Sequence, residues 1–300
     1  MNISHQLLGE SLALISAILW AGAIILFRKS TLTVHPIALN LFKNVFAILM
    51  ILLTILVRGE KLFIDLPFNY YLSFILSGVL GMAIADTLLF TSLNQIGASL
   101  HAIVACSYSP IVILLSVICL KEQLSILEIF GIVLITLAIL LTANPKFQPN
   151  IKPSQLIVGV ILGILANLFT GLGIILIKPK LNSVPLMWAT EVRLISGTVI
   201  LFLFVLLFPN RSRIFLSIFN PQGILYRISG SLLGTYLALV CWLGAMKFSK
   251  ASLAAVLSQS SSIFIFLFAY FFLKEKLSRI KIVALAVAAM GVFLVFTKSF

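Results

Sequence analysis

Charged side chains are scarce in this chain of 300 residues. Asp, Glu, Lys and Arg make up only 10% of it, and eight residues are acidic. Soluble domains contain roughly 25% charged residues, so the composition excludes an ordinary soluble protein. Hydrophobic residues account for 61% of the chain, which is more apolar surface than a soluble fold of this length buries. The sequence therefore predicts an integral membrane protein.

Histidine and cysteine are also rare, with three residues of each. The histidines His5, His35 and His101 lie near the N-terminus or near ends of apolar segments, whereas a membrane-embedded enzyme needs catalytic groups clustered on facing helices. The cysteines fall inside apolar segments, where a thiol usually behaves as a small hydrophobe. We therefore expect no enzyme, no disulfide, and neither a metal nor another cofactor.

The basic residues outnumber the acidic ones, and the formal net charge is +13. They are spread over the ends of apolar segments and are not interleaved with aromatic residues, so nucleic-acid binding is not expected. Lys and Arg beside a bilayer are attracted to anionic lipid by about 1 kcal/mol each. With a cytoplasmic N-terminus, more basic residues fall outside than inside, so the positive-inside rule does not support that orientation.

Apolar stretches separated by short polar breaks follow one another along the chain. Each is long enough for a helix to cross a hydrocarbon core of roughly 30 Å. The first continues into Arg28 and Lys29 without a small-residue cleavage site, which predicts a retained helix. The sequence predicts ten such helices, at 9–27, 36–57, 70–93, 98–120, 124–142, 156–177, 185–208, 224–246, 251–273 and 279–297.

The chain contains an internal repeat. Residues 98–144 reappear without a gap as 251–297, at a constant offset of 153 (251 − 98), and the preceding part matches at an offset of 150. Each half is therefore one five-helix unit, covering 1–144 and 156–300, with a Pro-containing linker at 145–155. Five is an odd number, so the second unit begins on the opposite side of the membrane. The predicted fold is an all-α polytopic membrane protein of ten transmembrane helices in two inverted five-helix repeats, as in many secondary transporters.

Short motifs recur at the ends of the fourth helix of each half. Ala-Ser follows Gly97 in the first copy and Lys250 in the second, and the helix closes with Lys121-Glu122 or Lys274-Glu275. We expect the two Lys-Glu pairs on opposite faces of the membrane. These motifs resemble the EamA branch of the drug/metabolite transporter superfamily, over essentially the whole chain.

Two further positions fit the family pattern in part. The family has a proline in the fourth helix of a repeat, which is Pro110 in the first copy and is replaced by Ile263 in the second. The family's basic residue in the second helix corresponds to Lys43 and Arg193. The resemblance implies a central cavity lined by helices 1, 3, 4, 6, 8 and 9, and both termini in the cytoplasm, in the plasma (inner) membrane. Members of this family carry amino acids, nucleosides, other metabolites or drugs, often as exporters.

Charged residues inside the predicted helices need partners, because burying one costs roughly 2.5 to 3.5 kcal/mol. Lys43 lies about 10 Å from the start of its helix and Asp86 about 12 Å from the end of the antiparallel one, so an ion pair is possible. The pair either couples proton movement to transport or fixes helix packing. Arg193 corresponds to Lys43 in the repeat, but Asp86 corresponds to Leu239.

The remaining candidates are polar or aromatic residues on the presumed cavity helices. Glu191 and Arg193, near a helix end, are expected to extend to the headgroups, and His101 is expected at headgroup level. The serine-rich runs that include Ser107 and 258–262 occupy repeat-related positions, where they either line the cavity or join helices. The predicted cavity lining is Trp20, Asp86, Ser107, Tyr108, Asn167, Thr170, Tyr236, Trp242 and Gln259.

The sequence thus predicts a secondary transporter that moves a small polar or amphipathic metabolite by alternating access. Export and proton coupling through Asp86 and Lys43 are hypotheses. No ATP-binding loop is recognisable, so an ion gradient or the substrate's own gradient would supply the energy. The alternatives are a flippase for a lipid-linked substrate, with polar groups on a lateral groove, or a non-catalytic membrane subunit. Ten helices in one chain favour a monomer in the lipid bilayer.

Overall fold

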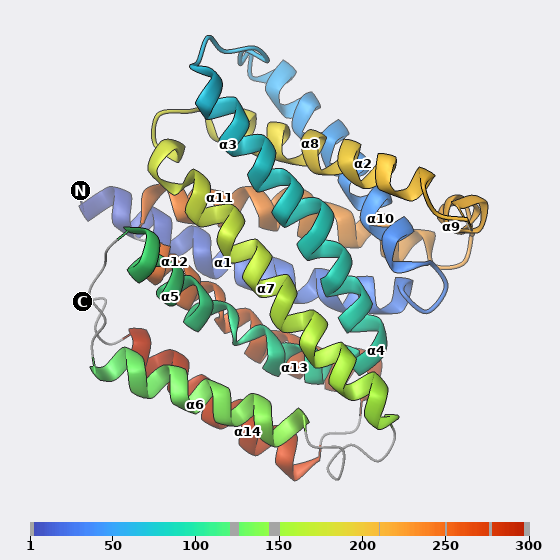
Figure 1. The fold of residues 1–300 in the computed structure, drawn as a ribbon, viewed down its shortest axis with the longest axis vertical. Helices are drawn as coiled ribbons and strands as arrows, with labels where there is room; N and C mark the ends of the chain where they lie inside the picture. Colours follow the sequence, from blue (N-terminus) through green and yellow to red (C-terminus); the bar gives the residue numbers. More distant parts are fainter. Residues whose placement is uncertain are drawn as a thin grey trace.

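The computed structural model describes residues 3–120, 126–143, 151–209, 211–249, 251–275 and 278–296. Within these ranges the chain folds into helices and forms no strand (Figure 1). The first half contains α1 (Ile3–Ser30), α2 (Pro36–Val57), α3 (Phe68–Gly78), the π-helix η1 (Val79–Ala85), α4 (Asp86–Ala105), α5 (Tyr108–Leu120) and α6 (Ile126–Ala143). The second half contains α7 (Pro153–Leu181), α8 (Leu186–Leu206), α9 (Arg211–Ile218), α10 (Ile224–Gly230), the π-helix η3 (Ser231–Ala238), α11 (Leu239–Phe248), α12 (Ala251–Ser258), α13 (Ser260–Leu273) and α14 (Arg279–Phe296).

Helices long and apolar enough to cross a membrane dominate the described residues. Six continuous helical stretches qualify, at 7–30, 36–57, 68–105, 153–181, 186–206 and 224–248. Shorter apolar helices lie at Tyr108–Cys119, Ile129–Leu141 and Ser260–Leu273. This arrangement is that of a polytopic membrane protein. The predicted Lys-Glu pair at Lys121 and Glu122, and most of the predicted linker at 145–155, lie outside the described residues.

Two of the predicted helices are interrupted in the middle. The predicted segment 98–120 is divided between α4 and α5 at Cys106 and Ser107, and 251–273 is divided between α12 and α13 at Gln259. Pro110 follows the first interruption, because proline lacks an amide hydrogen and is tolerated only in the first turn of a helix. The second interruption has no proline, and the hydroxyl of a flanking serine bonds to the local backbone instead. Ser260 donates to the carbonyl of Leu257 at 2.8 Å.

Wide helical turns occur at matching places in the two halves. Adding the offset of 153 to Val79–Ala85 gives 232–238, which lies within η3. A π-helical turn contains an extra residue, and such turns are frequent at functional sites. In the first half, the Met82 carbonyl accepts hydrogen bonds from the side-chain amides of Asn40 at 2.9 Å and Asn44 at 3.4 Å. The wide turn is thus held by α2.

Helices α3 and α8 approach each other closely because both carry glycine at the crossing. A Cβ atom added at Gly78 would lie 2.2 Å from the backbone oxygen of Arg193, and one added at Gly197 would lie 2.6 Å from the backbone oxygen of Gly78. Neither position therefore has room for a side chain. This contact fixes which face of α8 turns toward the interior of the bundle.

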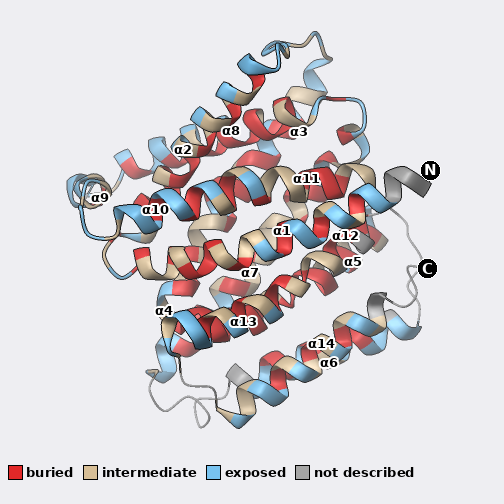
Figure 2. Ribbon diagram, turned by 180° about the vertical axis from the view of Figure 1, so that it is seen from behind, coloured by how far each residue is buried: buried red, intermediate tan, exposed pale blue. Residues whose placement is uncertain are grey.

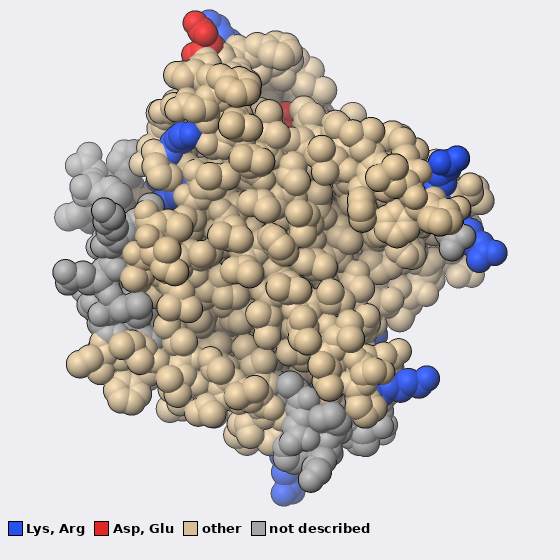
Figure 3. Space-filling model, in the orientation of Figure 1, with Lys and Arg blue, Asp and Glu red and all other residues tan. Residues whose placement is uncertain are grey.

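The outer surface of the bundle is apolar. Buried residues face the neighbouring helices, whereas exposed residues lie on the outer faces (Figure 2). Many exposed side chains are large and hydrophobic, among them Leu53, Val199 and Phe202. On the face drawn in Figure 3, Lys and Arg lie at the margins and an uncharged expanse separates them. That distribution is expected of a protein whose middle contacts lipid tails and whose ends contact water. The first turn of α1 and the last turn of α14 lie on the same side of the molecule (Figure 1).

Candidate functional site

A cavity lies in the centre of the bundle. It contains about 980 Å³ of empty space, counting the part that is open to solvent. Both halves of the chain contribute to its walls, and neither α6 nor α14 does. The lining residues are Ser16, Ala17, Trp20, Lys43, Gly81, Met82, Asp86, Leu89, His101, Ala105, Tyr108, Asn167, Thr170, Arg193, Gly234, Thr235, Ala238, Leu239, Trp242, Ser258, Gln259 and Ser261.

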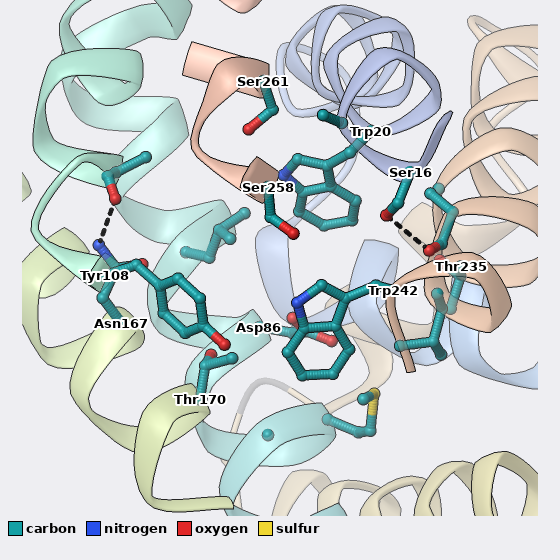
Figure 4. A pocket seen from close by; sticks show the side chains of 18 of the residues that line it. Ser16, Trp20, Asp86, Tyr108, Asn167, Thr170, Thr235, Trp242, Ser258 and Ser261 are labelled. Atoms are coloured by element: carbon teal, nitrogen blue, oxygen red, sulfur yellow. Dashed lines mark hydrogen bonds between the residues drawn. The ribbon is translucent and has the colours of Figure 1, made fainter. Parts of the chain in front are cut away.

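Most of the residues predicted from the sequence to line a cavity lie in this one. They are Trp20, Asp86, Tyr108, Asn167, Thr170, Trp242 and Gln259. Figure 4 shows the rings of Trp20, Tyr108 and Trp242 around the same space. The set comes from α1, α4, α5, α7 and α11, with Gln259 between α12 and α13. These elements belong to the helices that the family resemblance assigned to the cavity.

Two predicted residues lie outside the cavity lining, because their hydroxyl groups are engaged elsewhere. Ser107 accepts a hydrogen bond from the side-chain amide of Asn167 at 2.8 Å, so it positions a lining residue. The hydroxyl of Tyr236 lies 2.7 Å from the hydroxyl of Thr54 on α2. Contrary to the prediction, these two side chains therefore do not line the cavity.

Lys43 and Asp86 form a buried ion pair. The Lys43 ammonium donates to Oδ2 of Asp86 at 2.6 Å and to Oδ1 of Asn44 at 2.7 Å. Lys43 is almost fully buried, and 16% of the Asp86 side chain is exposed. Asp86 begins α4 directly after the wide turn η1, so this turn sets the direction of its carboxylate. Because both residues line the cavity, the pair lies where a substrate would be held.

Arg193 is fully buried and lines the same cavity. Its guanidinium carbon lies 5.7 Å from the centre of the Trp242 ring, and Nη2 would be 3.2 Å from a Cβ atom added at Gly81. None of its three side-chain nitrogens has a hydrogen-bond partner among the described residues. The prediction that Arg193 and Glu191 extend to the headgroups is therefore wrong: both are buried, because the Gly78–Gly197 crossing turns this part of α8 inward.

The sequence-based interpretation missed Arg193 as a lining residue, together with Ser16 and Thr235 of the two long cavity helices. The repeat held the signal for Arg193, since it occupies the position of Lys43. His101 was expected at headgroup level, but it is 4% exposed and lines the cavity. Its Nδ1 lies 3.3 Å from the hydroxyl of Ser92, which faces it across the Gly97 bend.

Polar contacts tie the helices together at the two ends of the bundle. Arg28, at the end of α1, donates to the backbone oxygen of Asn94 at 2.9 Å. Lys178, at the end of α7, donates to the backbone oxygens of Met246 and, at 2.6 Å, of Ser249. Arg28 and Lys178 correspond in the repeat at the offset of 150 (178 − 28). A basic side chain near helix carbonyls is favourable because they carry partial negative charge.

A multi-pass membrane protein, helical over its described residues, with a central cavity lined by apolar, polar and charged side chains has the architecture of a membrane transporter. The chain belongs to the EamA-like transporter family, whose model matches residues 7–144 and again 157–297. A protein of known crystal structure matches 100% of this chain and 98% of its own, with a TM-score of 0.69 and 17% sequence identity. At that identity the likeness shows the fold alone. No curated protein matches the sequence.

Proposed function

We propose that this protein is a secondary transporter of a small polar or amphipathic metabolite. The observation that carries the proposal is the central cavity, whose walls come from α1, α2, η1, α4 and α5 of the first half and from α7, α8, η3, α11, α12 and α13 of the second. A site between two repeated halves is reached from either side when the halves rock against each other. The family match supports transport as the activity.

The mechanism we propose is alternating access between two inverted five-helix halves, 1–144 and 156–300, within a set of ten transmembrane helices. Three repeat-related details support the inverted arrangement. The wide turns η1 and η3 coincide at the offset of 153, Arg28 and Lys178 make similar contacts to helix carbonyls, and Lys43 and Arg193 reach the same cavity. Residues at equivalent positions of the two repeats thus make equivalent contacts.

The ion pair of Lys43 and Asp86 supports proton coupling as part of this proposal. A carboxylate beside a cavity gains a proton more readily when desolvated and loses it more readily when an ammonium approaches. Movement of α2 relative to α4 would change both the desolvation of Asp86 and its distance from the Lys43 ammonium. Export, a plasma (inner) membrane location, cytoplasmic termini and action as a monomer also belong to this proposal. A flippase is less favoured, because the charged groups Lys43, Asp86 and Arg193 lie at the central cavity.

Metabolite efflux from proteoliposomes tests the proposal. Vesicles loaded with a cell extract and containing the purified protein should lose specific metabolites faster than protein-free vesicles, as measured by mass spectrometry. Thr170→Trp, which fills the cavity, should reduce that loss at least tenfold. Phe202→Trp is the matched control, since Phe202 is exposed on the outer surface and should leave the loss unchanged. Equal efflux with and without the protein would contradict transport.

A further inference from the structure

The unpaired Arg193 suggests the charge of the substrate. Two cations, Lys43 and Arg193, line the cavity, but only one carboxylate, Asp86, lines it with them. Asp86 pairs with Lys43 at 2.6 Å. Among the described residues, no carboxylate oxygen lies within 4.0 Å of the Arg193 guanidinium. The lining therefore carries one positive charge in excess, and the single Asp86 carboxylate is the negative charge that both cations share.

The repeat explains why Arg193 has no partner. Lys43 and Arg193 correspond to each other, but the position of Asp86 is occupied in the second half by Leu239. Leu239 lies on α11, lines the cavity and precedes Trp242 by one helical turn. The second half thus keeps the cation and replaces its carboxylate with an apolar side chain that faces the same space.

A buried guanidinium without a partner is costly, and arginine cannot shed its proton to relieve that cost. Its side chain also does not reach the headgroups, because the close crossing of α8 over Gly78 turns this part of α8 toward the cavity. The Trp242 ring at 5.7 Å supplies a cation–π contact, which does not use the N–H donors in the plane of the guanidinium. Those donors have no hydrogen-bond partner among the described residues.

We propose that the substrate of the transport function proposed above is a small amphipathic organic monoanion, whose carboxylate pairs with Arg193. The planar guanidinium presents paired N–H groups that match a carboxylate geometrically. One negative charge balances the one positive charge in excess. Arg193 lines the same cavity as Trp20, Tyr108 and Trp242, whose rings surround that space (Figure 4). They provide an apolar surface for the rest of the substrate molecule.

Paired acids and amides test this assignment, because each pair has nearly the same shape and differs in charge. The probes are 2-naphthylacetate with 2-naphthylacetamide, and cyclohexanecarboxylate with cyclohexanecarboxamide. Affinities are obtained from the rise of the thermal unfolding midpoint of the full chain in lipid nanodiscs with probe concentration. The wild type should bind each acid about ten- to a hundredfold more tightly than its amide, as expected for charge-assisted hydrogen bonds.

Variants identify the residue responsible. Arg193→Gln should bind acid and amide equally. Leu239→Asp adds a carboxylate to the cavity at the repeat position of Asp86, so it should also abolish the preference for the acid. It provides a test even where Arg193→Gln fails to fold. Leu239→Asn is the matched control, because it changes the shape and polarity of the side chain in the same way without adding charge, and it should keep the preference.

Three results would overturn the assignment: equal binding of acid and amide by the wild type, a preference for the acid that survives Leu239→Asp, or no binding of either acid. The efflux measurement decides the transport function separately, since it uses no probe compound. If the protein releases metabolites but binds acids and amides equally, the proposal of an anionic substrate is wrong and the proposal of transport stands.

Discussion

The carboxylate of Glu275 accepts a hydrogen bond from the backbone amide of Ala98 at 2.9 Å, although the two residues are 177 positions apart. The same carboxylate accepts from the Ser99 amide at 3.0 Å. Both amides follow Gly97, whose positive φ of 76° begins a new helical direction. Glu275 therefore acts as a helix cap supplied by the other half of the chain, and a carboxylate is favoured there by the partial positive charge of the helix N-terminus.

Replacing this cap should loosen one end of the cavity. Glu275→Gln removes the charge and keeps the size, so it should weaken the contact by about 1.5 to 3 kcal/mol. In a variant with all three cysteines changed to alanine and a new cysteine at Leu89, which lines the cavity, labelling by an impermeant maleimide should accelerate severalfold. Glu60→Gln alters only the partly exposed pair of Arg58 and Glu60 and should leave labelling unchanged. No acceleration in Glu275→Gln would show that this contact does not hold the end closed.

Asp86 should act through its charge. Asp86→Asn nearly preserves volume, so we expect loss of proton-coupled flux in proteoliposomes while substrate binding is partly retained. The control is Asp65→Asn, at an exposed loop position, which should transport as the wild type does. Wild-type flux with an unchanged pH profile in Asp86→Asn would make the residue a packing element.

The Lys43–Asp86 pair should also affect stability in a non-additive way. Lys43→Met leaves a buried carboxylate without its partner, and such losses cost about 3 to 5 kcal/mol. The double variant Lys43→Met with Asp86→Leu removes both charges and should be less destabilised than Lys43→Met alone. The midpoint of thermal unfolding in nanodiscs measures both effects, and additive losses would argue that the two side chains do not interact.

The glycine crossing of α3 and α8 should not tolerate a methyl group. Gly197→Ala would place its Cβ 2.6 Å from the Gly78 oxygen, so the helices must separate, at a cost of about 1 to 3 kcal/mol. Gly22→Ala is the control, because its nearest contact would be an ordinary 3.7 Å to a Leu233 methyl group. A thermal unfolding midpoint as high in Gly197→Ala as in Gly22→Ala would mean that α8 adjusts freely.

Periodicity and the repeat predict the membrane class and the proximity of Lys43 to Asp86, which follow from helix length, helix order and depth. The helices that surround the cavity were predicted from the family resemblance. The sequence did not predict the direction of the Arg193 side chain, because the depth of a residue along a helix does not give the rotation of that helix about its axis. That rotation depends on which face packs, and here the Gly78–Gly197 contact decides it. The wide turns and the interruptions at Ser107 and Gln259 also depend on packing between helices, which no single segment encodes.

The unequal partners of Lys43 and Arg193 bear on the resting state of the molecule. In the alternating-access mechanism proposed above, a perfectly duplicated carrier would have two conformations, each facing one compartment, that are related by rotation and equal in free energy. Neither would predominate without a gradient. Here the exchange of Asp86 for Leu239 removes that degeneracy. Under that mechanism one conformation is the more populated at rest, and the anion proposed above would compensate the cation of only one half. Binding of the substrate would thus shift the populations of the two conformations, so the two directions of transport would not be equivalent.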